Sequence, residues 1–298
     1  MRILAGLAFS VLTASTALAA DPVQDAGPTG TRFFGEAYLG GHVLFGSEQD
    51  EDFLVPMVDL GARVAGQIGA FGAQLDGEYS GFKLDWVRPE IDLGAADGSV
   101  TAIGFTGHAT YNFGESLKAG AYLGYMRGGV SITDGIDFVD INLDSLVYGV
   151  EAIYQINENN WIEANVGLVD PRNFTVTSTM GFPMPSMPLD DISGFNVGAG
   201  YTHRFNPQWT ATGKVNYTRL TAFDESVDFL SLKAIAAYQL ETMPLVVSSS
   251  LGYTNISTGG ESVDAFNIGA RLTLKFGDSG NDAGGKLFST RRALDGFF

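Results

Sequence analysis

The feature that most restricts the fold of this chain is a side-chain alternation with a period of two, which recurs in segments of about ten residues. In the segment 71–81, Phe71 and Leu75 fall on one face, while Asp76 and Glu78 fall on the other, because successive side chains of a strand leave opposite faces. Beyond the N-terminus no apolar stretch approaches the ~18 residues of a membrane-spanning helix. The chain is therefore predicted to be all-β.

Twelve segments carry this alternation, and the connections between them are of two kinds. The predicted strands are 33–45, 54–68, 71–81, 100–113, 117–126, 146–156, 161–169, 195–205, 209–218, 228–240, 245–254 and 265–276. Short turns alternate with longer loops. This pattern is typical of an antiparallel meander barrel with turns at one end and loops at the other. A soluble sandwich or propeller also alternates, so it stays as the competing prediction.

Aromatic residues on the apolar face are sorted by depth. Those near the turn ends are Phe71, Tyr111, Tyr154, Phe205, Trp209, Tyr238 and Phe276, and those near the loop ends are Phe45, Tyr79, Tyr125, Tyr148, Tyr217, Tyr253 and Phe266. We name these two sets the turn-end girdle and the loop-end girdle. A soluble core gives no reason for such sorting, whereas two water–lipid interfaces do. The girdles therefore predict a transmembrane β-barrel.

The last predicted strand carries a short motif, NIGARLTLKF over 267–276. Its polar, glycine, apolar and aromatic positions are Asn267, Gly269, Leu272, Leu274 and Phe276. This motif resembles the terminal-strand assembly signal of bacterial outer-membrane β-barrels, the porin-like superfamily, here of a twelve-stranded type. The resemblance covers roughly 31–276. It implies insertion by the barrel-assembly machinery into the outer membrane of a Gram-negative cell, with the bilayer and outer-leaflet lipopolysaccharide as partners.

The N-terminus has the composition of a cleaved signal peptide. Arg2 supplies positive charge, 3–12 is apolar, and Ala17 and Ala19 form a small-x-small cleavage site, while the apolar run is too short for a membrane anchor. The predicted organisation is a signal peptide at 1–19, a short periplasmic segment at 20–30, a transmembrane barrel at 31–276 and a periplasmic tail at 277–298.

The tail departs from the family pattern, because related barrels usually stop at the aromatic residue that ends the last strand. Residues 277–282 are rich in turn formers, which predicts a flexible periplasmic appendage dispensable for assembly. A second interpretation stays open, in which basic Lys286, Arg291 and Arg292 dock the tail onto the acidic lumen wall as a plug.

Charged residues at inward positions divide by sign along the chain. The acidic ones come first and the basic ones later, in the order Glu36, Asp59, Asp76, Glu78, Glu151, Glu163, Arg204, Lys214, Lys233, Arg271 and Lys275, with Arg63 and Lys118 as exceptions. Because strand order is spatial order in a meander, acidic and basic walls should face one another across a pore. The alternative is that salt bridges between them fill a closed lumen.

Many inward positions are glycine, and two interpretations of them stay open. Unfilled, they would leave a bore of ~10 Å in a twelve-stranded wall. They could instead make room for large neighbours such as Tyr38 and Tyr122.

The connections at the loop end are mostly acidic, with Asp134, Asp137, Asp140 and Asp144 in the third loop. One interpretation is that these carboxylates only solvate the loops. The other is that they bind divalent cations together with the phosphates of lipopolysaccharide. The fourth loop, within 170–193, is apolar and proline-rich, and should enter the lumen or contact a partner.

Several function classes are excluded. The formal net charge of −17 argues against nucleic acid as a partner. The absence of cysteine excludes disulfide scaffolds, thiolate metal sites and cysteine nucleophiles, and no cofactor or metal is predicted. One family of twelve-stranded barrels hydrolyses phospholipids on the outer wall with Ser, His and Asn. Here His42 and His108 are inward and His203 lies near a periplasmic turn, so no enzyme activity is expected.

The predicted function is an outer-membrane channel for passive diffusion of small hydrophilic solutes or ions. The alternative is a non-conducting structural or adhesive barrel. An autotransporter translocator is disfavoured, because residues 20–30 are too few for a passenger and a pore-spanning helix. The solute, ion selectivity and oligomeric state stay open.

Overall fold

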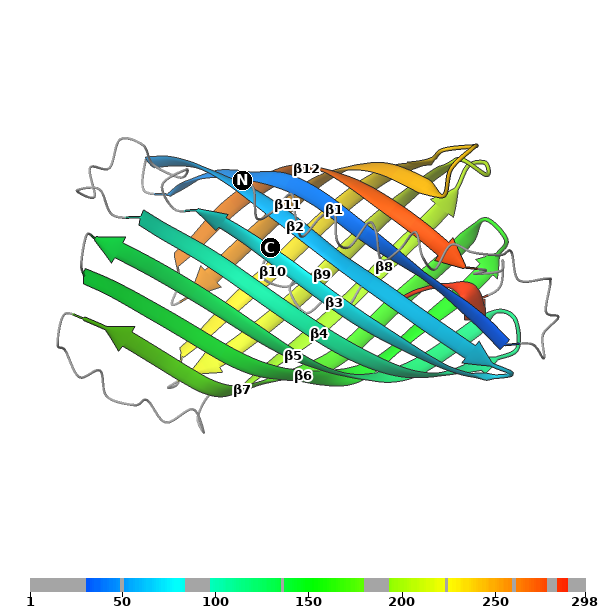
Figure 1. The fold of residues 1–298 in the computed structure, drawn as a ribbon, viewed down its shortest axis with the longest axis horizontal. Coiled ribbons are helices and arrows are strands. Elements are labelled where there is room, and N and C mark those ends of the chain that lie inside the picture. Colours follow the sequence, from blue (N-terminus) through cyan, green and yellow to red (C-terminus); the bar gives the residue numbers. More distant parts are fainter. Residues whose placement is uncertain are drawn as a thin grey trace.

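In the computed structural model the chain forms a closed barrel of twelve antiparallel strands (Figure 1). The structure describes residues 31–48, 51–83, 97–134, 137–179, 193–222, 225–258, 261–277 and 283–288. The strands are β1 (Thr31–Glu48), β2 (Glu51–Ile68), β3 (Phe71–Lys83), β4 (Asp97–Phe113), β5 (Leu117–Asp134), β6 (Asp137–Asn157), β7 (Asn160–Ser178), β8 (Ser193–Arg204), β9 (Trp209–Ala222), β10 (Glu225–Gln239), β11 (Leu245–Thr258) and β12 (Glu261–Gly277). The predicted all-β class and strand number are confirmed. Within these ranges no helix is long and apolar enough to cross a membrane.

Each strand pairs with its chain neighbours, and β1 pairs with β12 to close the barrel. In the closing register Gly35 lies opposite Phe276 and Phe45 opposite Phe266. The short turns lie at the right-hand end of Figure 1, where β1 begins and β12 ends. Gly69 in the β2–β3 turn has a φ of 59°, a conformation that glycine adopts without steric cost.

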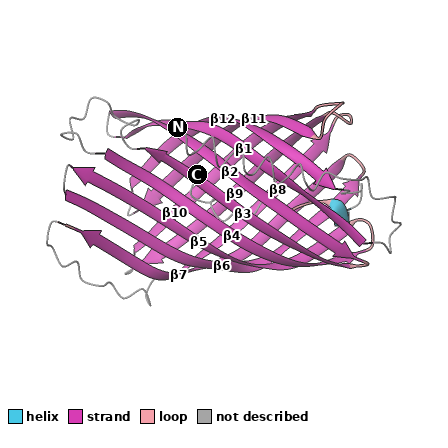
Figure 2. Cartoon of the chain, in the orientation of Figure 1, coloured by secondary structure: helices cyan, strands magenta, loops and turns pink. Residues whose placement is uncertain are grey.

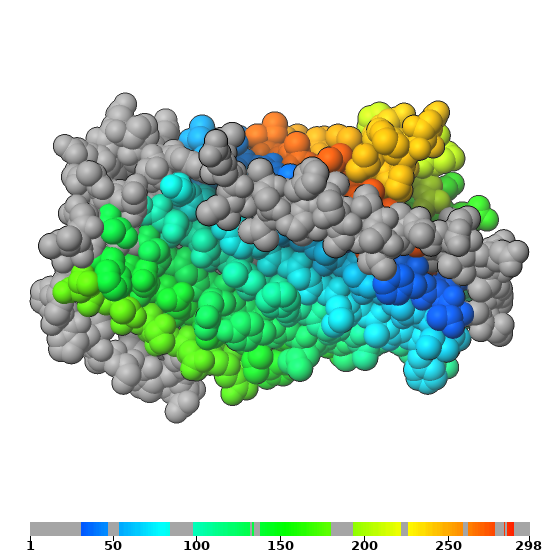
Figure 3. Space-filling view, in the orientation of Figure 1, coloured from blue at the N-terminus to red at the C-terminus, as the bar shows by residue number. Residues whose placement is uncertain are grey.

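Residues that alternate along each strand face alternately the outer surface and the lumen of the barrel. Leu75 and Phe105 are 68% and 60% exposed on the outer surface, whereas their chain neighbours Gln74 and Thr106 are 1% and 4% exposed on the inner one. Side chains of β2 to β6 form a continuous outer wall in the view of Figure 3. An apolar exterior over a polar interior is the arrangement that lipid requires of a barrel.

The two girdles form ring contacts between neighbouring strands. At the loop end Phe45 and Phe266 lie with ring centroids 6.1 Å apart, and at the turn end Phe71 and Tyr111 lie 5.1 Å apart in an edge-on arrangement. These rings are directly opposite in the strand register, where cross-strand aromatic pairs stabilise a sheet.

At the loop end the strands run further than predicted. The acidic residues expected in the third loop lie instead on a hairpin of β5 and β6, with Ser131 opposite Asp140 and Arg127 opposite Asp144. The expectation of a loop there is wrong, because the backbone ladder does not depend on side-chain polarity, and the polar residues pair across it. The hydroxyl of Ser131 donates to Asp140 at 2.5 Å.

Strand β7 also continues past its predicted end, through Pro171. Proline lacks the N–H that a ladder needs, and the register against β6 shifts at this point, with Pro171 opposite Ser145 and Asn173 opposite Asp144. Arg172 is thus the extra residue of a β-bulge, which bends a strand without ending it. The β-bulge therefore accommodates Pro171, the residue that favours a loop in the sequence, without ending the strand.

The described part of the tail lies inside the barrel. A short 3-10 turn, η2 (Ala283–Gly285), is found at the turn end (cyan in Figure 2), and Ala283 and Phe288 are fully buried. Main-chain and ring contacts with the inner wall hold the segment 283–288, so for these residues the expected flexible periplasmic appendage is wrong. Docking of the tail through Lys286, Arg291 and Arg292 on the acidic wall stays a prediction. The signal peptide, the segment 20–30, the apolar residues 180–192 of the fourth loop, and Arg291 and Arg292 lie outside the described residues.

Candidate functional site

The predicted pore-lining residues project from the inner face of the barrel, but the structure divides them between two places. Asp59, Glu78, Lys214, Lys233 and Arg271 line a polar cavity in the middle of the lumen. Glu36, Arg63, Asp76, Glu151 and Glu163 lie in the more buried half that β1 to β7 form. Arg204 and Lys275 lie near the turn end, with the Arg204 guanidinium 5.8 Å from the Trp161 ring centre and Lys275 opposite Glu36.

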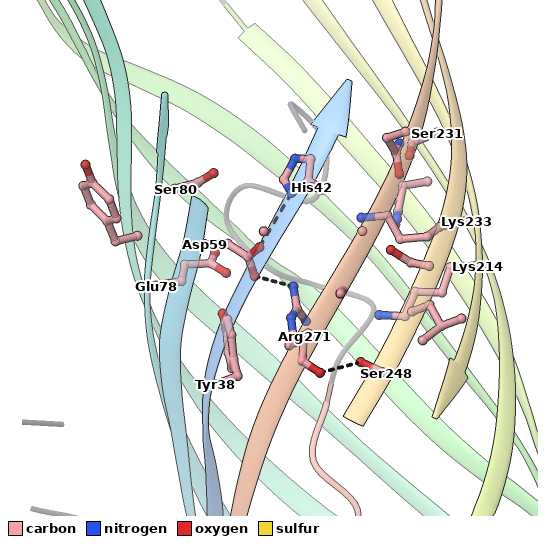
Figure 4. A pocket seen from close by; sticks show the side chains of 18 residues that line it. Tyr38, His42, Asp59, Glu78, Ser80, Lys214, Ser231, Lys233, Ser248 and Arg271 are labelled. Atoms are coloured by element: carbon pink, nitrogen blue, oxygen red, sulfur yellow. Dashed lines mark hydrogen bonds and ion pairs between the residues drawn. The ribbon is translucent and has the colours of Figure 1, made fainter. Parts of the chain in front are cut away.

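The central cavity, as we call the first place, has walls of opposite charge. Asp59 and Glu78 come from β2 and β3, and Lys214, Lys233 and Arg271 come from β9, β10 and β12. In Figure 4 the two lysine side chains point from their wall toward the carboxylates. The rest of the lining is largely hydroxyl and amide, including Ser231, Ser248, Ser250, Asn216 and Asn267.

Asp59 joins the two walls of the central cavity. Its carboxylate accepts a hydrogen bond from Arg271 at 2.7 Å and lies 3.6 Å from the Nδ1 of His42. The Arg271 guanidinium is also 4.5 Å from the centre of the Tyr38 ring. The Arg271 and Asp59 side chains keep 26% and 14% of their surface exposed, so the pair lies in contact with solvent.

A second set of charges forms a chain across β1, β2, β3, β4 and β6, which we call the buried network. Arg63 lies 3.3 Å from Glu36 and 3.8 Å from Asp76. His108 continues the chain, 3.4 Å from Asp76 and 2.6 Å from Glu151. The side chains of His108 and Glu151 have no exposed surface, and charges in such a low-dielectric place are stable only when paired.

Large side chains fill the glycine positions of this half. A Cβ at Gly149 or Gly167 would collide with the Tyr122 hydroxyl, and one at Gly61 would collide with Tyr38. These glycines therefore make room for neighbouring rings, which is the second of the two interpretations above. The lumen is filled there rather than uniformly open.

Sequence reasoning missed the partners of the tail segment. Gln74 and Arg63 bond to the main chain at Phe288, and Trp161 lies 4.3 Å from the Lys286 ammonium. The strand alternation does predict that Gln74 faces the lumen, but nothing in that pattern indicates which distant segment it binds. Phe288 follows a glycine-rich stretch and carries no alternation of its own.

At the loop end, outward-facing carboxylates pair across hairpins just beyond the loop-end girdle. Asp144 accepts from Arg127 at 2.6 and 2.9 Å, and these hydrogen bonds hold the pKa of Asp144 at about 2. Asp228 repeats the arrangement with Arg219 and the Tyr217 hydroxyl, and its pKa is also about 2. Such pairs satisfy polar groups next to the membrane boundary.

The predicted assembly-signal residues occupy both faces of β12. Asn267 and Gly269 point into the lumen, where Asn267 is buried. Leu272 is 45% exposed on the outer surface, Leu274 shares that face, and the Phe276 ring lies 6.4 Å from that of Phe33 at the turn end.

No protein-family model matches the sequence, and no curated protein matches it. Among solved structures, the chain is similar to the COG4313 outer membrane channel from Pseudomonas putida F1, with a TM-score of 0.56 and 12% identity over 86% of this chain and 100% of that one. It is also similar to the translocator domain of the autotransporter NalP from Neisseria meningitidis, with a TM-score of 0.50 and 10% identity over 91% and 96% of the two chains. At such identities the likeness concerns the fold. The fold is that of the outer-membrane β-barrels.

Proposed function

We propose that this protein is an outer-membrane channel for passive diffusion of small hydrophilic solutes or ions, and that the central cavity is part of its path. The observation that carries the proposal is the pair of opposed walls, with Asp59 and Glu78 on one side and Lys214 and Lys233 on the other. A barrel that served only as a scaffold would have no need of a solvent-exposed interior with both signs of charge.

The walls favour polar solutes by simple electrostatics. Charges of opposite sign across a narrow bore produce a transverse field, which orients dipolar solutes and disfavours apolar ones. The Ser231, Ser248 and Ser250 hydroxyls replace part of a solute's hydration, because each both donates and accepts hydrogen bonds. Such a lining needs no catalytic residue and no cofactor.

The proposed setting is the outer membrane, reached through a signal peptide and the barrel-assembly machinery. Basic Lys83 is exposed at the loop end, a placement that suits contact with lipopolysaccharide phosphates. This arrangement supports an orientation in which the loop end is extracellular and the turn end periplasmic.

A non-conducting structural barrel is the second candidate. It is favoured by the buried network and by the tail segment inside the turn end, both of which occupy lumen space. The two candidates differ in whether any ion path remains.

The test is conductance in a planar lipid bilayer, measured for the full chain and for a chain that ends at Gly277. Discrete conductance steps in either protein support the channel, and their absence in both overturns it in favour of the structural barrel. The chain has no cysteine, so a cysteine introduced at one residue is the only thiol and reports whether that residue lines the ion path. Charged thiol reagents should reduce current through Ser231→Cys, in the central cavity, and leave the outward-facing Leu232→Cys unchanged.

A further inference from the structure

The segment 283–288 is held inside the turn end of the barrel by specific contacts. It enters beside the β4–β5 turn, where the Ala283 N–H donates to the Glu115 carbonyl at 2.9 Å. Ala283 and Phe288 then pack with Ile153 of β6 in a cluster without solvent exposure, and Trp161 lies against it. This apolar cluster is enclosed within the lumen.

The inner wall recognises the main chain of this segment. Gln74 uses both ends of its amide at Phe288: the Phe288 N–H donates to Oε1 at 3.0 Å, and Nε2 donates to the Phe288 carbonyl at 3.3 Å. Arg63 donates to the same carbonyl at 3.2 Å, and the Lys118 ammonium donates to the Lys286 carbonyl at 2.7 Å. Three strands thus supply side chains that match the donors and acceptors of a peptide backbone.

The wall also recognises the side chain of Phe288. Its ring lies parallel to the His108 imidazole, with 5.9 Å between centroids and 4° between planes, and the Lys118 ammonium lies 4.7 Å from its centre. His108 is held in this orientation from behind by Asp76 and Glu151 of the buried network. The network therefore has a use beyond charge pairing, because it presents a flat surface to an aromatic ring.

The barrel does not require this segment to complete its backbone pairing, since β1 and β12 already close the sheet. The side chains of Gln74 and Arg63 nevertheless point their hydrogen-bonding groups at a peptide, and those groups are buried. Without the peptide, the buried Gln74 Oε1 would lose the Phe288 N–H that it accepts from, and the Phe288 volume would empty. Gln74 Nε2 would keep its bond to Asp76 at 2.8 Å, and Arg63 would keep its carboxylate partners.

We propose that Gln74, Arg63, His108 and Lys118 form a peptide-binding site inside the lumen, specific for a short segment with an aromatic side chain. Its ligand is the chain's own segment 286–288, so that the C-terminal region acts as a plug in the turn end. The consequence for conduction rests on the proposed channel function, whereas the binding of the segment does not.

Binding is tested first by thiol protection, which needs no ion current. A cysteine at Leu287 reports on the segment without removing the contacts at 286 and 288, and Glu158→Cys, on an exposed turn, is the control. The Leu287→Cys thiol should react with a maleimide more slowly than the control. Adding Gln74→Ala or Phe288→Ala should raise its rate by about tenfold, because labelling proceeds through local opening, and leave the rate at 158 unchanged. A thiol at 287 that reacts as fast as the one at 158 in every background would overturn the site.

Conductance then tests the plug. A chain ending at Gly277 and the Phe288→Ala variant should both conduct more than the full chain, while a matched chain ending at Phe288 should conduct as the full chain does. Protection at 287 with no current in any variant would leave the peptide site standing and refute the channel. Equal current in all four proteins would leave the channel standing and refute the plug.

Discussion

Arg271 of β12 reaches across Gly40 of β1 to bond the carboxylate of Asp59 on β2, with 2.7 Å between Nη2 and Oδ2. Gly40 lies opposite both residues in the strand register. A Cβ there would lie 2.8 and 2.9 Å from the two Asp59 oxygens. The absence of a side chain at residue 40 is what lets the ion pair span two strands and link the acidic wall to the basic one.

The central cavity should set ion selectivity, with opposite signs for its two walls. Neutralising Asp59 to Asn removes the carboxylate that offsets Arg271, so the permeability ratio should move toward anions by about twofold or more. Neutralising Lys214 and Lys233 to Gln should move it toward cations. Reversal potentials in a salt gradient measure both shifts, in the chain that ends at Gly277 so that the tail segment does not interfere.

Ser248→Ala is the control for these variants, since it changes the same lining without changing charge. It should leave the reversal potential where it was. Shifts of the same sign from the two walls would contradict the assignment of the central cavity as the path.

Much of the fold follows from local pattern. Strand number, inward parity and the two girdles depend on residues close in the chain, and period-two alternation places them. The sequence predicts a strand end before Pro171, because proline lacks the N–H that a strand ladder needs. The β-bulge that accommodates Pro171 depends on pairing with β6, which the local sequence does not show. The sequence predicts a loop at the acidic hairpin of β5 and β6 for a similar reason, since that hairpin is supported by cross-strand partners.

The lumen was less predictable, because contacts across it join residues far apart in sequence. The sequence pattern places Asp76 and Glu151 with Glu78 in one acidic wall, but in the structure Asp76 and Glu151 contact His108 in the buried network. The strand pattern predicts that each of these residues faces inward, but it does not predict which residue each one contacts across the lumen. The position of Phe288 against Gln74, separated by 214 residues, is the extreme case.

Breaking the buried network should destabilise the barrel. Glu151→Ala leaves His108 without its closest carboxylate in a dry interior, which should cost about 3 to 5 kcal/mol. Glu78→Ala, in the solvent-exposed central cavity, should cost below about 1 kcal/mol. Urea unfolding from lipid vesicles, followed by tryptophan fluorescence, measures both. Equal midpoints for the two variants would show that the network contributes no more than a solvated charge does.

Filling a glycine that accommodates Tyr122 should impair folding. In Gly149→Val the new side chain meets the Tyr122 hydroxyl and the backbone of β7, so overpacking should cost about 1 to 3 kcal/mol or more. Gly213→Val is the matched control, because a Cβ there has nothing within 4 Å. The yield of heat-modifiable, folded barrel on gels compares them. A normal yield of Gly149→Val would mean that Tyr122 does not need the space.

Acid should loosen the β5–β6 hairpin at its loop end. The folded pKa of Asp144, about 2, lies below the usual 3.8, so its ion pair stabilises the hairpin above pH ~4 and is lost as the pH falls toward about 2. Proteolysis of the hairpin by an acid-stable protease should accelerate over that interval. Asp144→Asn should cleave faster already at pH 5 and show less of the acceleration, whereas an unchanged pH profile would assign the acid response to other groups.

The last strand offers a way to separate insertion energy from assembly recognition. Leu272 on β12 and Leu251 on β11 both face outward, 45% and 62% exposed, and Leu251 and Leu272 lie on adjacent strands. An aspartate at either residue places a charge on the lipid face, which should destabilise the inserted barrel by up to about 2 to 4 kcal/mol at mid-depth. Only Leu272→Asp also alters the proposed assembly signal, so its level in the outer membrane of cells should fall well below that of Leu251→Asp. Refolding of both purified variants into vesicles, without the assembly machinery, should be impaired to a similar extent. Equal losses in cells would show that the lipid cost alone accounts for the defect and that Leu272 carries no signal.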